Sequence, residues 1–187
     1  MSSHHIVRDN QEPALLILEA NTVALEIVQE LLEWSPSVII DESQLDHVLS
    51  WGIKIDVILF QEKNKEMITE KVIEQFPVKL LGYQADENPL QVALHFLKAG
   101  NYPSVNIIAD QPNVLDYLIS FQSEMDIVVI QDQIRWSLVR SGHFEKLVAD
   151  NAMFFTLESN AHKMLMPGVD NKIRVKKDQP FWIGEKL

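Results

Sequence analysis

The stretch IKIDVILFQEKNKE, residues 53–66, places an apolar run directly before a charged turn and a second, helix-like segment. The apolar run has the length and composition of a strand that is buried on both faces. In open α/β proteins, ligands bind just beyond the carboxyl ends of such strands. The turn carries Gln61, Glu62 and Lys63 and no glycine. It therefore stands where a ligand site belongs, but it lacks the glycines of a phosphate loop and the carboxylates of a metal site.

Strand and helix patterns alternate on both sides of this stretch. Apolar runs predict strands at residues 14–18, 37–41, 54–60, 78–82, 104–109 and 126–130, and amphipathic segments predict helices at 21–34, 43–52, 64–76, 88–100 and 112–121. This alternation predicts an α/β fold, with a mostly parallel sheet and helices on both of its faces.

Capping residues support several of these helices. Asn88 and Pro89 form a helix start, and Gly100 follows the last apolar residue of the same segment. Asn21 or Thr22 is a candidate cap for the first helix. Asn64 could cap the helix that follows the charged turn, and Pro112 stands near the start of the last one.

The pattern changes after Gln131. Short β-like runs with no helix between them occupy residues 136–140, 153–158, 163–167, 172–177 and 181–185. We therefore divide the chain into an α/β domain, residues 1–131, and a small all-β C-terminal domain, residues 132–187. The second part is too short for a complete sandwich, so we expect it to pack against something else, such as a second copy of the chain.

The late segment is rich in large apolar residues, and two interpretations of them stay open. They either form an interface or close the core of the small β part itself. The residues concerned are Met153, Phe154, Phe155, Phe181 and Trp182.

Composition narrows the possible functions. The chain has no cysteine, which excludes disulfides and thiolate zinc sites and fits a reducing, cytoplasmic location. Its net charge of −11 argues against binding nucleic acid, which needs a basic surface. No apolar run reaches the roughly 18 residues of a membrane-spanning helix, and the first residues show no signal core. We expect neither nucleic acid nor membrane among its partners.

Common catalytic motifs are absent from the sequence. The six glycines form neither a dinucleotide fingerprint nor a P-loop, and no histidine pair has metal-binding spacing. His95 is expected on a helix surface. The basic stretch NKIRVKKDQ, residues 171–179, is either an anion-binding patch or the solvated face of a short strand or hairpin.

Four aspartates fall at positions that matter in a doubly wound fold. Asp41 ends the second predicted strand, Asp56 lies in the third, Asp86 precedes the best-capped helix, and Asp116 is one turn into the next helix. Asp41 and Asp86 should both lie at the carboxyl edge of the sheet, where ligands bind. The alternative is local, because aspartates are also common in turns and caps.

Three segments, residues 2–18, 31–59 and 143–146, resemble the thiamine pyrophosphokinases of the Bacteroidetes type. The resemblance covers roughly residues 2–150. It implies an α/β nucleotide domain followed by a β-sandwich that shapes the thiamine site. It also implies transfer of a pyrophosphoryl group from ATP to thiamine with magnesium, in a homodimer whose active site lies between subunits.

The family motifs are only partly present. Asp41 matches the aspartate of the first motif, Asp-Gly-Ala, within the local sequence DES. Asp56 matches the aspartate that leads into the second motif, Gly-Asp-Phe-Asp-Ser. Gln61 and Lys63 then stand where the two metal-binding carboxylates of that motif belong.

The third and fourth motifs are similarly reduced. Asp86 matches the first residue of Asp-x-Thr-Asp, but Asn88 and Pro89 replace the Thr-Asp pair. Asp116 matches the aspartate of the fourth motif, and Asn113 replaces its arginine. The family's serine-asparagine signature for thiamine has only a weak echo in SNAH, residues 159–162.

These departures predict a protein without useful pyrophosphokinase activity, because magnesium needs hard oxygen ligands and a lysine repels it. We then expect no cofactor, and a fold kept to bind a small molecule in the remnant cleft or to pair with another protein. A second hypothesis is an active enzyme that uses ATP and a rearranged magnesium site of Asp41, Glu62 and Asp86. A third is an anion-binding regulator that uses Lys63 and residues 172–177.

Overall fold

The computed structural model describes residues 12–111, 113–121, 125–149, 151–158 and 161–187. Six strands form a parallel sheet in the first part of the chain, in the order β4-β3-β2-β1-β5-β6. They are β1 (Ala14–Ile17), β2 (Ser37–Asp41), β3 (Val57–Gln61), β4 (Lys79–Tyr83), β5 (Ser104–Ile108) and β6 (Asp126–Gln131). β1, β3 and most of β2 are buried apolar runs, as the sequence predicts for strands covered on both faces.

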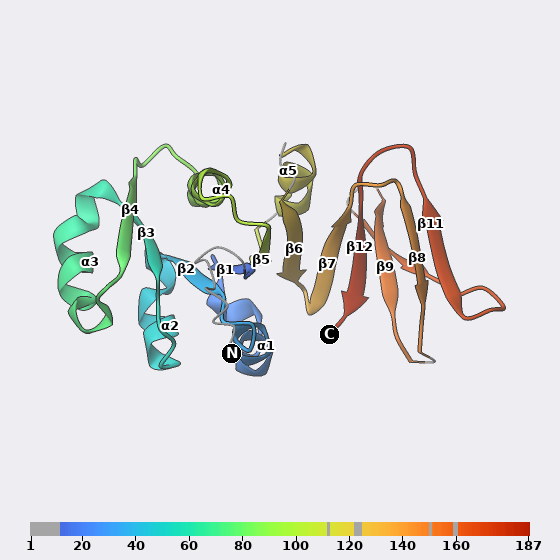
Figure 1. Ribbon diagram of the computed structural model, residues 1–187, viewed down its shortest axis with the longest axis horizontal. Coiled ribbons are helices and arrows are strands. Elements are labelled where there is room, and N and C mark those ends of the chain that lie inside the picture. Colours follow the sequence, from blue (N-terminus) through green and yellow to red (C-terminus); the bar gives the residue numbers. More distant parts are fainter. Residues whose placement is uncertain (1–11, 112, 122–124, 150, 159–160) are drawn as a thin grey trace, which may run out of the picture.

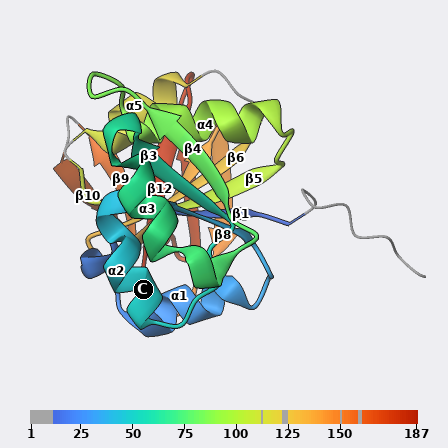
Figure 2. The ribbon, with the colours of Figure 1, turned by 90° about the vertical axis from the view of Figure 1, so that its left-hand side faces the viewer.

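Within the described residues, five α-helices cover the two faces of this sheet (Figures 1 and 2). They are α1 (Leu25–Leu32), α2 (Leu45–Ser50), α3 (Lys65–Lys71), α4 (Pro89–Ala99) and α5 (Val114–Ser120). α4 and α5 pack in one hydrophobic cluster, and α1, α2 and α3 pack in the other. The predicted α/β class, with helices on both faces of a mostly parallel sheet, is therefore confirmed.

The predicted helix caps are right at one helix and wrong at two others. Asn88 caps α4, since its Oδ1 accepts a hydrogen bond from the Leu90 amide at 2.9 Å. Asn21 and Thr22 lie instead in a separate 3-10 turn, and α1 begins later without a side-chain cap. Asn64 sits at the start of α3 but makes no capping bond, because its side chain donates to Glu42. Pro112 lies outside the described residues.

The C-terminal part continues the same sheet. β7 (Ile134–Val139) runs antiparallel to β6 after a two-residue turn, Asp132 and Gln133, whose φ angles are +54° and +58°. This turn has the backbone of a tight hairpin, and the predicted domain boundary near residue 132 falls within it. β12 (Phe181–Lys186), β9 (Phe154–Glu158) and β10 (Ala161–Leu165) follow outward, so the sheet reaches ten strands.

A separate two-stranded sheet closes the C-terminal part. It consists of β8 (His143–Leu147) and β11 (Lys172–Lys176), paired antiparallel. The sequence pattern does not predict β8, because four of its five residues are exposed and it shows no apolar run.

Both faces of the C-terminal strands find partners within the chain. One face carries Trp136 and Trp182, and the indole Nε1 of Trp182 donates to the Leu115 carbonyl of α5 at 3.0 Å. The other face carries Phe154 and Phe181, which pack with residues of β8 and β11. The C-terminal part thus packs against something else, as expected, and α5 of the same chain supplies part of that contact.

The large apolar residues that the sequence singles out in the C-terminal part are divided between the core and the surface. Phe154, Phe181 and Trp182 are buried in the core and Phe155 is half-buried against it, whereas Met153 is 41% exposed. Gly184 of β12 makes the packing possible, since a Cβ there would lie 2.6 Å from Ile134 Cγ2 and 2.9 Å from the Trp136 ring.

Charge is distributed unevenly along the chain. Residues 1–131 carry 20 acidic and 7 basic side chains, whereas residues 132–187 carry 7 acidic and 9 basic ones. The first part therefore has a net charge of −13 and the second a net charge of +2. None of the described helices is long and apolar enough to cross a membrane.

Candidate functional site

The carboxyl ends of β2, β3 and β4 bring the first group of predicted residues together. Gln61 at the end of β3 is paired in register with Tyr83 at the end of β4. Asp41 ends the neighbouring strand β2 and is only 7% exposed. This is the sheet edge at which the sequence predicts a ligand site.

Hydrogen bonds within the protein occupy both carboxylate oxygens of Asp41. Its Oδ2 accepts from the Tyr83 hydroxyl at 2.9 Å, and its Oδ1 accepts from the Ser43 amide at 3.0 Å and from the Ser43 hydroxyl. Burial raises the pKa of Tyr83, and the neighbouring carboxylates of Asp41 and Glu42 raise it further. Tyr83 is therefore a neutral donor that holds Asp41 in place.

The next carboxylate along the chain is also used internally. Glu42 Oε1 accepts from the Gln61 backbone amide at 3.0 Å, and both of its oxygens accept from the Asn64 side-chain amide at 3.0 Å. Glu42 thus ties the start of α2 to the end of β3. Gln61 contributes a buried side-chain oxygen, Oε1, that has no hydrogen-bond partner among the described residues.

The three residues proposed for a rearranged metal site do not gather there. Glu62 folds over Gly82 of β4, where an added Cβ would lie 1.9 Å from its Oε1. Asp86 is exposed in the turn before α4. Within the described residues, no group of three or more histidine, aspartate or glutamate side chains could hold a metal ion.

Two other predicted residues of this region have different surroundings. Asp56 precedes β3, at the opposite end of the strand from Gln61, and its Oδ2 accepts from the Val38 amide at 2.9 Å. That bond connects the neighbouring strands β2 and β3, and such structural bonds are common for aspartates in turns. Lys63 is exposed in the 3-10 turn after β3, and Pro89 opens α4.

A second group of residues surrounds a cavity of about 240 Å³ between α5 and the C-terminal strands. Two residues that the sequence resemblance singles out, Asn113 and Asp116, line this cavity. Gln131, Leu157 and His162 also line it, and sequence reasoning does not identify them. The cavity thus combines amide, carboxylate and imidazole groups with an apolar wall.

The cavity has unused hydrogen-bonding capacity. No hydrogen bond or ion pair among the described residues engages the side chains of Asp116 or His162. The His162 ring lies against the buried Trp136 ring, with 4.9 Å between centroids, and Trp136 Nε1 has no partner in the same set of residues. Trp136 does not line the cavity, but the exposed side chains of Asp116 and His162 do, and their polar groups are open to a ligand as well as to solvent.

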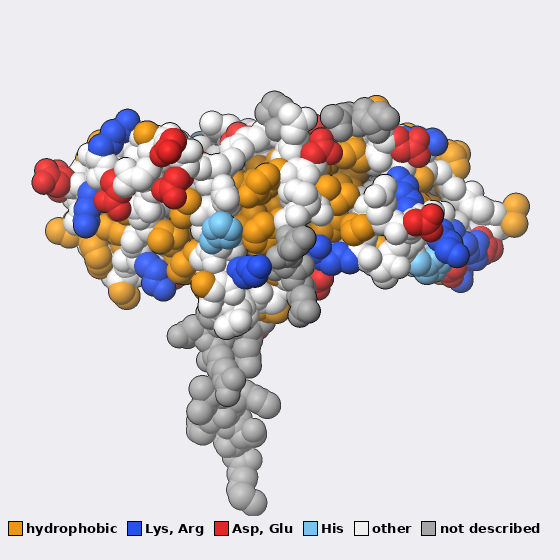
Figure 3. All heavy atoms as spheres, turned by 90° about the horizontal axis from the view of Figure 1, so that it is seen from above, with side chains coloured by type: hydrophobic (Ala, Val, Ile, Leu, Met, Phe, Trp, Pro, Cys, Tyr) orange, Lys and Arg blue, Asp and Glu red, His pale blue; other side chains and the backbone are white. Residues whose placement is uncertain are grey.

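Two of the basic residues after residue 170, Lys172 and Arg174, pair with acidic neighbours. Glu145 accepts from Lys172 Nζ at 2.5 Å and from Arg174 Nε at 2.8 Å, and Arg174 also pairs with Asp170. Hydrogen bonds from Lys172 and Arg174 lower the pKa of Glu145. Basic and acidic groups lie side by side at the β8–β11 end (Figure 3), and Arg174 and Lys176 lie on an exposed face of β11. The turn between β3 and α3, which carries Lys63, lies in the other half of the molecule (Figure 1), so Lys63 cannot join this stretch.

The chain thus has an α/β domain whose sheet is continued by an antiparallel β part. Polar residues lie at the carboxyl edge of the parallel strands. Solved structures similar to this fold include thiamine pyrophosphokinases. The Bacillus subtilis thiamine pyrophosphokinase has a TM-score of 0.67 and 10% identity, over 94% of this chain and 98% of that one. The Candida albicans thiamin pyrophosphokinase has a TM-score of 0.61 and 7% identity, over 96% and 90%.

A probable thiamine pyrophosphokinase from Staphylococcus saprophyticus has a TM-score of 0.58 and 11% identity, over 94% of this chain and 99% of that one. At these identities the likeness shows the fold. Almost the whole Bacillus chain, its C-terminal part included, has a counterpart here. No family model matches the sequence, and no curated protein matches it.

Proposed function

We propose that the chain is a thiamine pyrophosphokinase-like protein that has lost pyrophosphate transfer and keeps its fold to bind a small molecule. One observation carries this proposal. The carboxylates at the ends of β2 and β3 that could serve a metal, Asp41 and Glu42, already accept hydrogen bonds on both of their oxygens from protein groups.

The residues at this sheet edge do not fit magnesium and ATP. Magnesium in such sites takes one or two carboxylates together with phosphate oxygens, in a near-octahedral arrangement. Asp41 would have to leave Tyr83 and Ser43, and Glu42 would have to release Asn64. Gln61 and Lys63 supply no negative charge in compensation, so we derive no transfer step through a metal nucleotide.

The cavity beside α5 is the better place for a ligand. Asp116, Asn113, Gln131 and His162 offer both donors and acceptors, and apolar residues form the rest of its wall. Its volume of about 240 Å³ suits a small molecule with several hydrogen-bonding groups. The ligand that this proposal implies is therefore small, partly polar and bound without a metal.

Two assays test the proposal together, with the Bacillus thiamine pyrophosphokinase as positive control. We expect no thiamine diphosphate from ATP, magnesium and thiamine. We also expect no thermal shift that needs both ATP and magnesium, although a ligand at 100 times its dissociation constant adds about 2.7 kcal/mol. Product formation that is lost in Asp41→Asn would instead support the alternative of an active enzyme with Asp41, Glu62 and Asp86 at a metal.

We further propose a cytoplasmic homodimer. The family resemblance implies the dimer, and the absence of cysteine suits a reducing compartment. Light scattering after size exclusion measures the oligomeric state directly, and a monomer at micromolar concentration would contradict the proposal.

A further inference from the structure

We propose that the outer edge of β10, together with an adjoining methionine-lined groove, binds an extended segment of another protein, which adds to the sheet as a further strand. This site lies in the C-terminal part, away from the α/β sheet edge, and does not depend on the loss of catalysis.

β10 is the last strand at its end of the ten-stranded sheet. Among the described strands it pairs only with β9, so its outer side has no strand neighbour (Figure 2). Its first four residues are exposed and the fifth is half-buried. An edge strand of this kind presents unpaired backbone N–H and C=O groups, which are a template for pairing with another chain.

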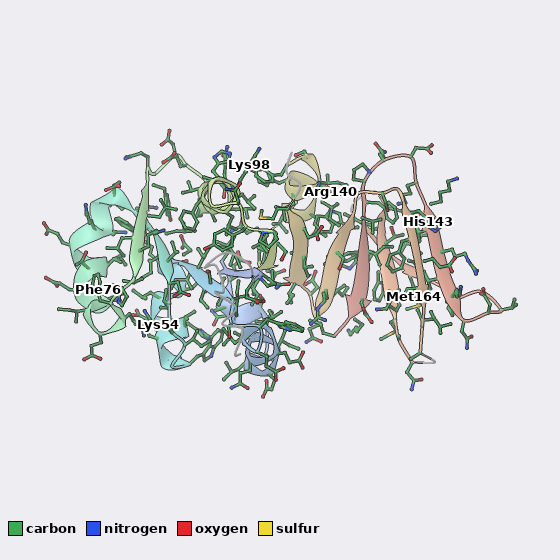
Figure 4. All side chains as sticks on the ribbon, viewed as in Figure 1. Lys54, Phe76, Lys98, Arg140, His143 and Met164 are labelled. Carbon is green, nitrogen blue, oxygen red and sulfur yellow. The ribbon has the colours of Figure 1, made fainter. Side chains whose placement is uncertain are left out.

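A groove of about 340 Å³ adjoins the end of this strand. Met164 and Leu165 of β10 line it, together with Met166 and Met153, and Asn151 and Asn171 add amide groups. None of the lining residues that the structure describes is charged. Met153, Met164 and Met166 are 41%, 51% and 79% exposed (Met164 is marked in Figure 4).

Exposed apolar residues concentrate around this groove. Ten large apolar side chains are exposed among the described residues, and five of them lie between residues 147 and 169. Methionine side chains are flexible and polarizable, and they suit surfaces that adapt to a partner. The concentration therefore indicates a binding surface rather than scattered surface residues.

The chemistry of the site selects its occupant. A free row of backbone donors and acceptors calls for an extended chain, and an uncharged groove calls for apolar side chains. Side chains of a strand alternate between faces, so only every second residue of the segment would enter the groove. The described lining of the groove offers no charged group that would pair with a charged side chain. The partner is therefore an uncharged strand with apolar side chains at alternate positions.

A second copy of β10 suits the edge less well. Antiparallel pairing of two such strands centred on Lys163 would place the two lysines directly opposite each other. Like charges in that arrangement are destabilising. A segment of a different protein avoids this contact.

The test uses the full chain labelled with ¹⁵N and a capped heptapeptide of alternating threonine and leucine. We expect saturable shifts of the backbone amides of residues 161–166 in ¹H–¹⁵N spectra. The same peptide with N-methylated central residues should not bind, because it retains the side chains but cannot donate to the sheet. Equal binding of both peptides, no binding, or shifts confined to other residues would each overturn the proposal.

Two matched variants locate the site. Met164→Lys places a charge in the groove and should weaken peptide binding by roughly tenfold or more, as loss of a central contact does. Met67→Lys makes the same change at a 48% exposed methionine of α3 and should leave binding unchanged. A changed oligomeric state in Met164→Lys would assign the edge to a second copy and would also overturn the proposal.

Discussion

Two places at the carboxyl edge of one sheet use their polar residues in opposite ways. At the ends of β2, β3 and β4, Asp41 and Glu42 are held by donors from the protein itself. Beside α5, the side chains of Asp116 and His162 line a cavity and meet no hydrogen-bond partner among the described residues. Of these two aspartates, Asp41 is thus held by the protein itself, whereas Asp116 is exposed beside a cavity.

The largest expected effect on stability concerns the packing of β12 against Trp136 of β7. Gly184→Ala puts a Cβ within 2.9 Å of the Trp136 ring, and we expect it to lower the free energy of unfolding by about 3 kcal/mol. Gly168→Ala is the matched control, because its nearest contact is the end of a side chain, the Asp170 carboxylate at 3.1 Å, and not a buried ring. Urea denaturation measures both. Equal effects would show that Trp136 does not need Gly184.

The next largest effect on stability is expected at Asp41, the buried carboxylate at the end of β2. Asp41→Asn should destabilise the protein by about 2 kcal/mol, because the amide cannot accept all the bonds that Tyr83 and Ser43 donate. Tyr83→Phe and the double variant complete a cycle that isolates the pair. If Asp41→Asn instead raised the melting temperature, Asp41 would belong with the residues that are poised for a ligand.

The same pair should make stability depend on pH in the alkaline range. The pKa of Tyr83 is raised in the folded protein, whereas tyrosine in the unfolded chain ionises near pH 10. Above that pH the unfolded state binds fewer protons than the folded state, so the free energy of unfolding falls as the pH rises.

Tyr83 alone contributes a slope of at most about 1.4 kcal/mol per pH unit. Chemical denaturation of the wild type and of Tyr83→Phe at several pH values above about 9 measures this slope. The variant should lose less stability than the wild type. Parallel curves for the two proteins would mean that Tyr83 ionises with a normal pKa.

The smallest effect on stability is expected at the cavity. Asp116→Asn should change the free energy of unfolding by no more than about 0.5 kcal/mol, since the carboxylate is exposed and has no partner in the described residues. It should nevertheless weaken any ligand that binds there. A loss as large as that of Asp41→Asn would erase the contrast between the two places.

Much of the fold was predictable because local signals agree with the tertiary structure. Buried apolar runs gave the parallel strands, and Asn88, Pro89 and Gly100 bracket α4 as the capping rules require. β8 escaped prediction because its side chains face solvent and leave no apolar pattern. Asn64 stands at the cap position of α3 but forms a long-range bond to Glu42 in preference to a local one, and Asn21 and Thr22 form a separate 3-10 turn before α1.

The candidate site was less predictable, since it depends on contacts between distant segments. The sequence identified Asp41, Asp116 and Asn113, but not the role of Tyr83, which lies 42 residues from Asp41. His162 reaches the cavity only because the outer strands bring it to the Trp136 ring. No spacing in the sequence encodes that approach.

The two-residue turn between β6 and β7 has a consequence for how the protein melts. Backbone hydrogen bonds run without interruption from the parallel strands into the antiparallel ones. Neither part can therefore unfold without leaving an unpaired strand edge on the other. Calorimetry should therefore record one cooperative transition instead of two. For the same reason, a fragment that ends at Gln131 should aggregate, although the sequence places a domain boundary there.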